Sequence, residues 1–337
     1  MNRVISIIIA ILGCFVFSQN AVGQSTLVPP SQTPPWLIEV GPGPEDLVID
    51  PSQEYARLLI SSCDRRERGI QGEIISYRLD DGSVQVLKRR GEPAGVKLNP
   101  HGIDLARVNG TWMLYVISHE GDRHPIYQYE VHSDHLNFVK GYWDPLIVSP
   151  NALTVFPDGS FMVCNDAAKH GSMMEKILKM RRSTIVYCDG RANYTVAASR
   201  LGMPAGMNHL GNTLFVSDAT GNKIYTFRIS DGALSQKKKL CRIKGPDNIR
   251  FTAGGELLVA AHEKTLRFVR HVSNPTVPSP TVIYRIDPAT GAKTRIFSDT
   301  GSLISAGSVA VEWEGYLYIG QIFESHLLKT VTLSNLL

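Results

Sequence analysis

The sequence lacks the short motifs that mark several common chemistries. None of its five cysteines form a C-x-x-C pair, so neither a zinc ribbon nor a thiol redox site is indicated. It has no G-x-S-x-G nucleophile elbow and no glycine-rich phosphate loop. His119-Glu120 and His124 are one residue too far apart for the H-E-x-x-H metalloprotease motif. These absences argue against serine hydrolases with an elbow, zinc proteases and P-loop nucleotide hydrolases.

The chain also lacks a large net charge of either sign. The chain has 35 basic and 31 acidic residues, spread along its length, for a formal net charge of +4. Such a balance gives no concentrated basic patch, so we expect no nucleic-acid partner. The fractions of apolar residues (43%) and charged residues (20%) are those of a soluble globular protein and give no sign of disorder.

The one long hydrophobic run lies at the N-terminus. Residues 4–17 are mostly apolar, and Ala21-Val22-Gly23 supplies the small residues that a signal peptidase requires. We therefore predict a signal peptide over residues 1–23, a Pro-rich linker over 24–35, and a secreted, periplasmic or lumenal protein. The run is short for a membrane span, but a retained signal segment would act as a surface anchor.

Cysteine is scarce in the predicted mature chain as well. Export permits disulfides, but the remaining cysteines show no paired spacing. We expect four buried single thiols: Cys63, Cys164, Cys188 and Cys241.

An internal repeat is the main feature that is present. A short β-rich segment, usually entered through glycine, occurs six times, at residues 56–62, 110–118, 159–166, 211–218, 255–262 and 315–322. A second kind of segment precedes each copy and a third follows it, which makes a repeated β-meander. We therefore predict an all-β fold, a six-bladed β-propeller over residues 36–337. A β-sandwich also has regular turn signals, but it gives no reason for one triplet of segments to recur six times.

Two insertions interrupt the repeat. Residues 167–182 carry Met173, Met174 and Leu178 at near-helical spacing among basic residues, which predicts a short helix. We interpret it as an amphipathic helix packed on the propeller face, with a lid or a membrane-surface contact as the alternatives. Residues 264–280 contain three prolines and are predicted to form a loop.

The second segment of each repeat begins with polar residues in five of six copies. Because the innermost strand of each blade lines the central tunnel, these starts should converge at one tunnel mouth. Aspartate and asparagine favour turns, which would explain any one of these residues by itself. Carboxylate and amide oxygens converging from several strands are also what Ca²⁺ requires. In chain order the positions are Glu45-Asp46, His101, Asn151, Ala205, Asp247-Asn248 and Ser308.

Two histidines are candidates for acid–base chemistry. His101 belongs to the converging set, and His119 ends the next strand of the same predicted blade. A lone histidine is more often structural than catalytic. Two in one blade beside a predicted metal site favour a general base, because imidazole titrates near neutral pH.

These residues lie in stretches that resemble the paraoxonases, which are calcium-dependent lactonases and arylesterases within the wider group of gluconolactonase-like six-bladed propellers. The matching stretches occur in family order and include GPEDLVIDP, NPHGID, YVISHEG, SPNALTVFPDG, PDNIRF and AGSVAVEWEGYLYIGQIF.

The resemblance implies two calcium ions and a histidine pair. It implies ligands of a catalytic calcium at Glu45, Asn151, Asp247 and Asn248. It also implies that Asp46 and the carbonyl of Ile103 bind a buried structural calcium. The implied active-site pair is His101 and His119, with His262 in the substrate pocket and the helical insertion 167–182 over the active site.

The chain departs from the family pattern at three places. Ala205 stands where the family has an asparagine ligand, and water or Asn208 would have to substitute. Ala152 stands where the family has an aspartate ligand of the structural calcium. The cysteines that join the termini in mammalian paraoxonases have no counterparts, so ring closure should rest on strand pairing and packing.

The expected activity is calcium-dependent hydrolysis of a small hydrophobic lactone or aryl ester. Calcium would polarise the carbonyl, and His101, supported by His119, would activate water. A non-catalytic propeller that binds a ligand or a protein is the first alternative, favoured by Ala205 and Ala152. The carbon–oxygen or carbon–nitrogen chemistry of strictosidine-synthase-like propellers is the second.

Overall fold

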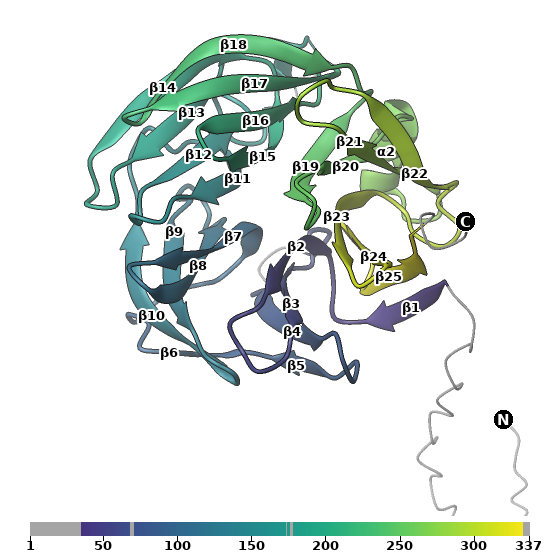
Figure 1. The fold of residues 1–337 in the computed structure, drawn as a ribbon, viewed down its shortest axis with the longest axis horizontal. Coiled ribbons are helices and arrows are strands. Elements are labelled where there is room, and N and C mark those ends of the chain that lie inside the picture. The colour runs from purple at the N-terminus through teal and green to yellow at the C-terminus, as the bar shows by residue number, and fades with distance from the viewer. Residues whose placement is uncertain (1–34, 68–70, 173, 176–177, 333–337) are drawn as a thin grey trace, which may run out of the picture. The chain divides into compact units, whose positions relative to one another are not determined.

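Six twisted sheets are arranged around a central axis in the part of the chain that the structure describes (Figure 1). The structure is a computed structural model and describes residues 35–67, 71–172, 174–175 and 178–332. The innermost strands of neighbouring sheets lie side by side around the axis, and the last contacts the first. The expected six-bladed β-propeller is therefore confirmed.

Each of the first five blades is a meander whose first strand is innermost. Blade one contains β2 (Pro44–Asp50), β3 (Arg57–Ser62), β4 (Glu73–Arg78) and β5 (Val84–Val86). Blade two contains β7 (Pro100–Val108), β8 (Thr111–Ser118), β9 (Ile126–Val131) and β10 (His135–Tyr142), extended at its edge by β6 (Lys88–Arg90). Blade three contains β11 (Pro150–Val155), β12 (Phe161–Asn165), β13 (Ser183–Cys188) and β14 (Tyr194–Leu201).

The other blades follow the same order. Blade four contains β15 (Pro204–Leu210), β16 (Thr213–Asp218), β17 (Lys223–Ser230) and β18 (Ala233–Cys241). Blade five contains β19 (Pro246–Phe251), β20 (Leu257–Ala261), β21 (Thr281–Ile286) and β22 (Lys293–Asp299). Blade six contains β23 (Gly307–Trp313), β24 (Tyr316–Gln321), β25 (His326–Val331) and, at its outer edge, β1 (Trp36–Glu39).

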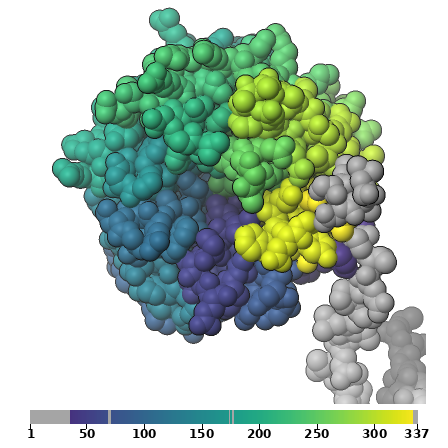
Figure 2. Space-filling view, viewed as in Figure 1, coloured from purple at the N-terminus to yellow at the C-terminus, as the bar shows by residue number. Residues whose placement is uncertain are grey.

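The strand β1 closes the ring. It pairs antiparallel with β25, so the N-terminal strand completes the C-terminal blade. The space-filling view shows the purple start of the propeller meeting its yellow end (Figure 2). Cys63, Cys164, Cys188 and Cys241 are all free and buried, as expected, so no disulfide supports this closure among the described residues.

The hydrophobic core lies between neighbouring blades. Second strands such as β3 are buried along their whole length, because both faces of the sheet pack against another blade. Between blades two and three, for example, Phe161 packs against Tyr142 and Tyr115 with ring centroids 5.1 and 5.7 Å apart. Burying each such side chain contributes about 1.5–3 kcal/mol relative to leaving it exposed.

The structure has a helix in the insertion that we expected to be a loop. The one helix bounded within the described residues is α2 (Thr265–Ser273), inside the segment 264–280 that we expected to be a loop. In 167–182, residues 173, 176 and 177 lie outside the described residues, and of the rest only Met174 and Glu175 are helical. Met174 and Leu178 are 63% and 65% exposed, so these two side chains do not pack on the propeller. A membrane-surface contact here stays a prediction.

The predictions for the N-terminal segment are not tested by the structure. The signal peptide at 1–23 and nearly all of the linker at 24–35 lie outside the described residues. No helix of the described chain is long and apolar enough to cross a membrane.

Candidate functional site

The polar residues predicted to converge lie just after the first residue of each inner strand. Five of the six inner strands begin with proline, which lacks an N–H donor and is therefore tolerated at the first residue of a strand. The pairing register shifts within the first residues of all six strands, as a β-bulge does. The sequence analysis missed these prolines, which mark the strand starts: Pro44, Pro100, Pro150, Pro204 and Pro246.

Two glycines allow inner strands to approach each other closely at this mouth. A Cβ at Gly206 would lie 2.3 Å from the backbone oxygen of Asp247, and one at Gly102 would lie 2.4 Å from that of Asn151. Neither distance can accommodate a methyl group. The glycines therefore let the polar residues of adjacent blades lie close together.

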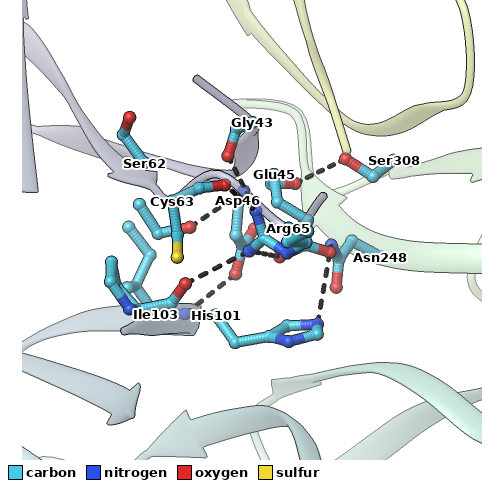
Figure 3. A network of polar contacts seen from close by, with 12 residues as sticks. Gly43, Glu45, Asp46, Ser62, Cys63, Arg65, His101, Ile103, Asn248 and Ser308 are labelled. Carbon is cyan, nitrogen blue, oxygen red and sulfur yellow. Dashed lines mark hydrogen bonds and ion pairs between the residues drawn. The ribbon is translucent and has the colours of Figure 1, made fainter. Parts of the chain in front are cut away.

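Glu45 is the central residue of the mouth (Figure 3). Its Oε1 accepts a hydrogen bond from Asn248 Nδ2 at 3.0 Å and lies 3.7 Å from His101 Nε2. Its backbone carbonyl accepts a hydrogen bond from Ser308 Oγ at 2.6 Å. Burial raises the pKa of the Glu45 carboxyl to about 8, although Arg65 opposes the shift. A further cation beside Glu45 would favour its ionised form.

Asp247 is contacted by a histidine of its own blade, blade five. His262 Nε2 lies 2.9 Å from Asp247 Oδ2, and the His262 ring stacks on Phe268 of α2 with centroids 4.2 Å apart. Thus the segment that we expected to be a loop supplies a helix that supports the predicted pocket histidine. His262 contacts a predicted calcium ligand directly.

The predicted catalytic-calcium ligands fit a hard cation. Within the described residues, Glu45 Oε2 and Asn151 Oδ1 are buried side-chain oxygens with no hydrogen-bond partner. Buried polar atoms are normally satisfied, and carboxylate and amide oxygens are what Ca²⁺ binds. The fit does not extend to Asn208, because its side chain bonds Ile249 O and the backbone N–H of His209. It therefore does not replace the ligand missing at Ala205.

The predicted structural-calcium ligands do not fit a metal ion. Arg250 Nη2 donates to Asp46 Oδ2 and to Ile103 O, both at 2.7 Å. Asp46 Oδ2 also accepts the Ile103 N–H at 2.9 Å, and Asp46 Oδ1 accepts the Leu47 N–H at 3.0 Å. The atoms expected to bind calcium are thus bonded to groups of the protein.

The two predicted catalytic histidines are in contact. His101 Nδ1 lies 3.0 Å from His119 Nε2, and His119 Nδ1 lies 3.0 Å from His124 Nδ1. His170 continues the group, with its ring centroid 4.2 Å from that of His124. The sequence analysis missed His124 and His170 in this role, because they lie in loops outside the repeat.

Arg65 is another residue that the sequence analysis missed. Its guanidinium donates to three backbone carbonyls around the mouth and lies 3.8 Å from Glu45 Oε2. It comes from the loop after β3, where no repeated pattern marks it. It places a fixed positive charge beside Glu45.

Comparisons with known proteins identify the family of this chain. The arylesterase family model matches residues 71–330. Human serum paraoxonase/lactonase 3 is 24% identical over 245 residues, which cover 68% of each chain, and the rabbit protein of the same name is 23% identical.

Solved structures share the fold at lower identity. A gluconolactonase from Xanthomonas campestris matches with a TM-score of 0.57 and 16% identity, covering 88% of this chain and 90% of that one. Regucalcin, a calcium-binding protein from Agrobacterium tumefaciens, matches with a TM-score of 0.52 and 11% identity, covering 89% and 92%. These likenesses show the propeller fold. The family model matches most of the chain, and the paraoxonases are similar to it in sequence. The chain therefore belongs to the arylesterase family.

Proposed function

We propose that this protein hydrolyses lactones or aryl esters with one calcium ion at the tunnel mouth. The observation that carries the proposal is a pair of buried oxygens without hydrogen bonds, Glu45 Oε2 and Asn151 Oδ1, next to a histidine pair. Glu45, Asn151, Asp247 and Asn248 would hold the ion. When bound, calcium supplies a Lewis acid that polarises the substrate carbonyl.

In this proposal the histidine pair acts as the general base that accepts a proton from the attacking water. His101 takes the proton at Nε2, the ring nitrogen not bonded to His119. Its Nδ1–H then donates to His119 Nε2, which spreads the positive charge over two rings. Removing such a general base lowers kcat by about 10²–10⁴-fold.

His262 is a positioning residue in this scheme. It contacts Asp247 Oδ2 at 2.9 Å and is itself fixed by stacking on Phe268. Its contact keeps one carboxylate oxygen of Asp247 in place and so restricts the orientation of the carboxylate.

The test is hydrolysis of a panel of lactones and aryl esters, with and without chelator. We expect turnover that stops on chelation and returns with calcium, a large loss of kcat for His101→Gln, and weakened calcium binding for Asp247→Ala. His132→Gln is the matched control, because His132 is stacked on His135 at the outer edge of blade two. Activity that ignores chelation would reject the calcium mechanism.

A non-catalytic binding propeller is the second candidate. It is favoured by Arg65, which already lies 3.8 Å from Glu45 Oε2, and by the missing ligand at Ala205. No turnover of any ester, together with tight binding of an unaltered ligand, would support it. Product analysis that shows simple release of a carboxylate would dismiss a strictosidine-synthase-like condensation.

A further inference from the structure

One arginine lies where the resemblance implies a second calcium ion. Arg250 is on β19 in blade five, and its Nη2 is 2.7 Å from both Asp46 Oδ2 and Ile103 O. Its Nη1 lies 3.6 Å from Asp104 Oδ1. One guanidinium therefore contacts two carboxylates and a carbonyl, the kinds of oxygen that Ca²⁺ would need.

The position of Arg250 places its charge inside the tunnel. Blades two and five are opposite each other in a ring of six, so the contact with Ile103 on β7 reaches across the axis. The side chain of Arg250 is only 9% exposed. A buried charge persists when it is paired and hydrogen-bonded, and Arg250 makes both kinds of contact.

The residue at position 152 also departs from the calcium site that the resemblance implies. Ala152 is buried and offers no side-chain oxygen where the resemblance implies an aspartate ligand. The chain therefore lacks one anionic ligand that the resemblance implies, and a cationic side chain bonds the two implied ligands that are present.

We infer that the guanidinium of Arg250 replaces the structural calcium and joins blades one, two and five by a built-in cation. The lower site, defined as Asp46, Asp104 and the Ile103 carbonyl, is then closed to metal. This inference does not depend on the proposed activity, because it concerns the lower site alone.

The first test counts calcium by elemental analysis after dialysis against calcium. We expect one ion per wild-type chain and less than one for Asp247→Ala, which removes one ligand at the mouth and leaves the lower site unchanged. Two ions in the wild type, or one in Asp247→Ala, would overturn the inference. No ion in either protein would reject the proposed calcium site at the mouth and leave the lower site closed as inferred.

The second test restores the ligands. In the double variant Arg250→Ser with Ala152→Asp, we expect one additional calcium ion and a melting temperature that falls with chelator and recovers with calcium. Arg250→Lys is the control that keeps the charge, and it should gain no ion. A folded double variant that gains no ion would contradict the inference. If it does not fold, the wild-type and Asp247→Ala counts still decide.

A separate observation points to a second kind of metal site. His119, His124 and His170 each offer a ring nitrogen, and these nitrogens all lie within 4.8 Å of one another. His119 Nδ1 and His124 Nδ1 are 3.0 Å apart, near the spacing of about 3.3 Å between two ligands of a tetrahedral zinc ion. Imidazole is a usual ligand of zinc, nickel and copper.

The surroundings of this cluster suit a cation. A surface cavity of about 350 Å³ is lined by His124, His170 and Asp122, and also by Lys169, so two of the three histidines can be reached from solvent. We propose that these three histidines bind a divalent transition-metal ion of the zinc class.

The test is zinc competition with a chromophoric chelator in calcium-saturated buffer. We expect one zinc per chain and at least tenfold weaker binding for His124→Gln and His170→Gln. His101→Gln, which alters a neighbour, and His132→Gln, a surface histidine, should bind zinc as the wild type does. No zinc binding by the wild type, or equal binding by His124→Gln, would show that the cluster is only a chain of hydrogen bonds.

Discussion

The buried carboxyl of Glu45 links protonation to metal binding. Its pKa is raised from the usual 4.5 to about 8, mainly because burial disfavours the charged form. Between these two values the metal-free folded protein holds a proton that the unfolded chain releases. The contribution of Glu45 to the stability of the metal-free protein should therefore be fully present below pH 4.5 and be lost as the pH rises toward 8.

This linkage predicts a pH-dependent calcium affinity. Calcium needs the carboxylate and displaces the proton, so affinity should rise about tenfold per pH unit from pH 6 to 7 and level off above 8. Calorimetric titrations at several pH values measure it. In Glu45→Gln the slope should vanish along with most of the affinity. A flat profile in the wild type would mean that Glu45 is already ionised without calcium.

Gly206 offers a second test at the residue scale. Gly206→Ala would place a methyl group 2.3 Å from Asp247 O, so blades four and five must move apart. Such overpacking costs about 1–3 kcal/mol, and calcium affinity should fall because Asp247 and Asn248 shift. Denaturant unfolding and calcium titration measure both. Gly254→Ala is the control, since the nearest atom to its Cβ is 3.7 Å away; equal effects of the two changes would contradict the argument.

At the scale of elements, ring closure rests on the short strand β1. Ile38 faces the core between the last and first blades, whereas Leu37 is 53% exposed. We predict that Ile38→Asn lowers the free energy of unfolding by about 2–4 kcal/mol, because it buries a polar group and leaves a cavity. Leu37→Asn should change it by less than about 0.5 kcal/mol. Equal losses would show that β1 contributes pairing alone.

The helix α2 shows why the loop prediction for residues 264–280 was wrong. Pro275 immediately follows the C-terminal residues of α2, and prolines commonly occur just past a helix end because they cannot continue it. We took the proline cluster as evidence for a loop through the whole insertion. In residues 167–182, Met174 and Glu175 are helical, but Met174 and Leu178 are exposed, so these two side chains do not pack on the propeller. Tertiary packing, more than local propensity, stabilises most helices.

At the scale of the whole molecule, the calcium at the mouth should stabilise the entire ring. Its proposed ligands come from β2, β11 and β19, in alternate blades. At a calcium concentration of 100 Kd the gain is about 2.7 kcal/mol. We predict one unfolding transition that moves up by a few degrees with calcium and not with magnesium, which prefers a tighter octahedral site. Scanning calorimetry measures it, and two separate transitions would show that the blades do not unfold together.

The sequence by itself determined the repeat, the number of blades and the set of residues at the tunnel mouth. These follow from local periodicity, because equivalent positions of equivalent strands must meet at one end of a propeller. Glu45, Asn151 and Asp247 were identifiable in this way, and Pro44 and its counterparts would have fixed the strand starts.

Only the tertiary structure decided which charges meet across the ring. Arg250 lies four residues into its strand, where nothing in the local pattern distinguishes it from a surface arginine. It reaches Asp46 and Ile103 because blades two and five face each other in a closed ring of six. His124 and His170 likewise come together from loops of different blades. Such contacts depend on ring closure and side-chain reach, which a periodic pattern does not encode.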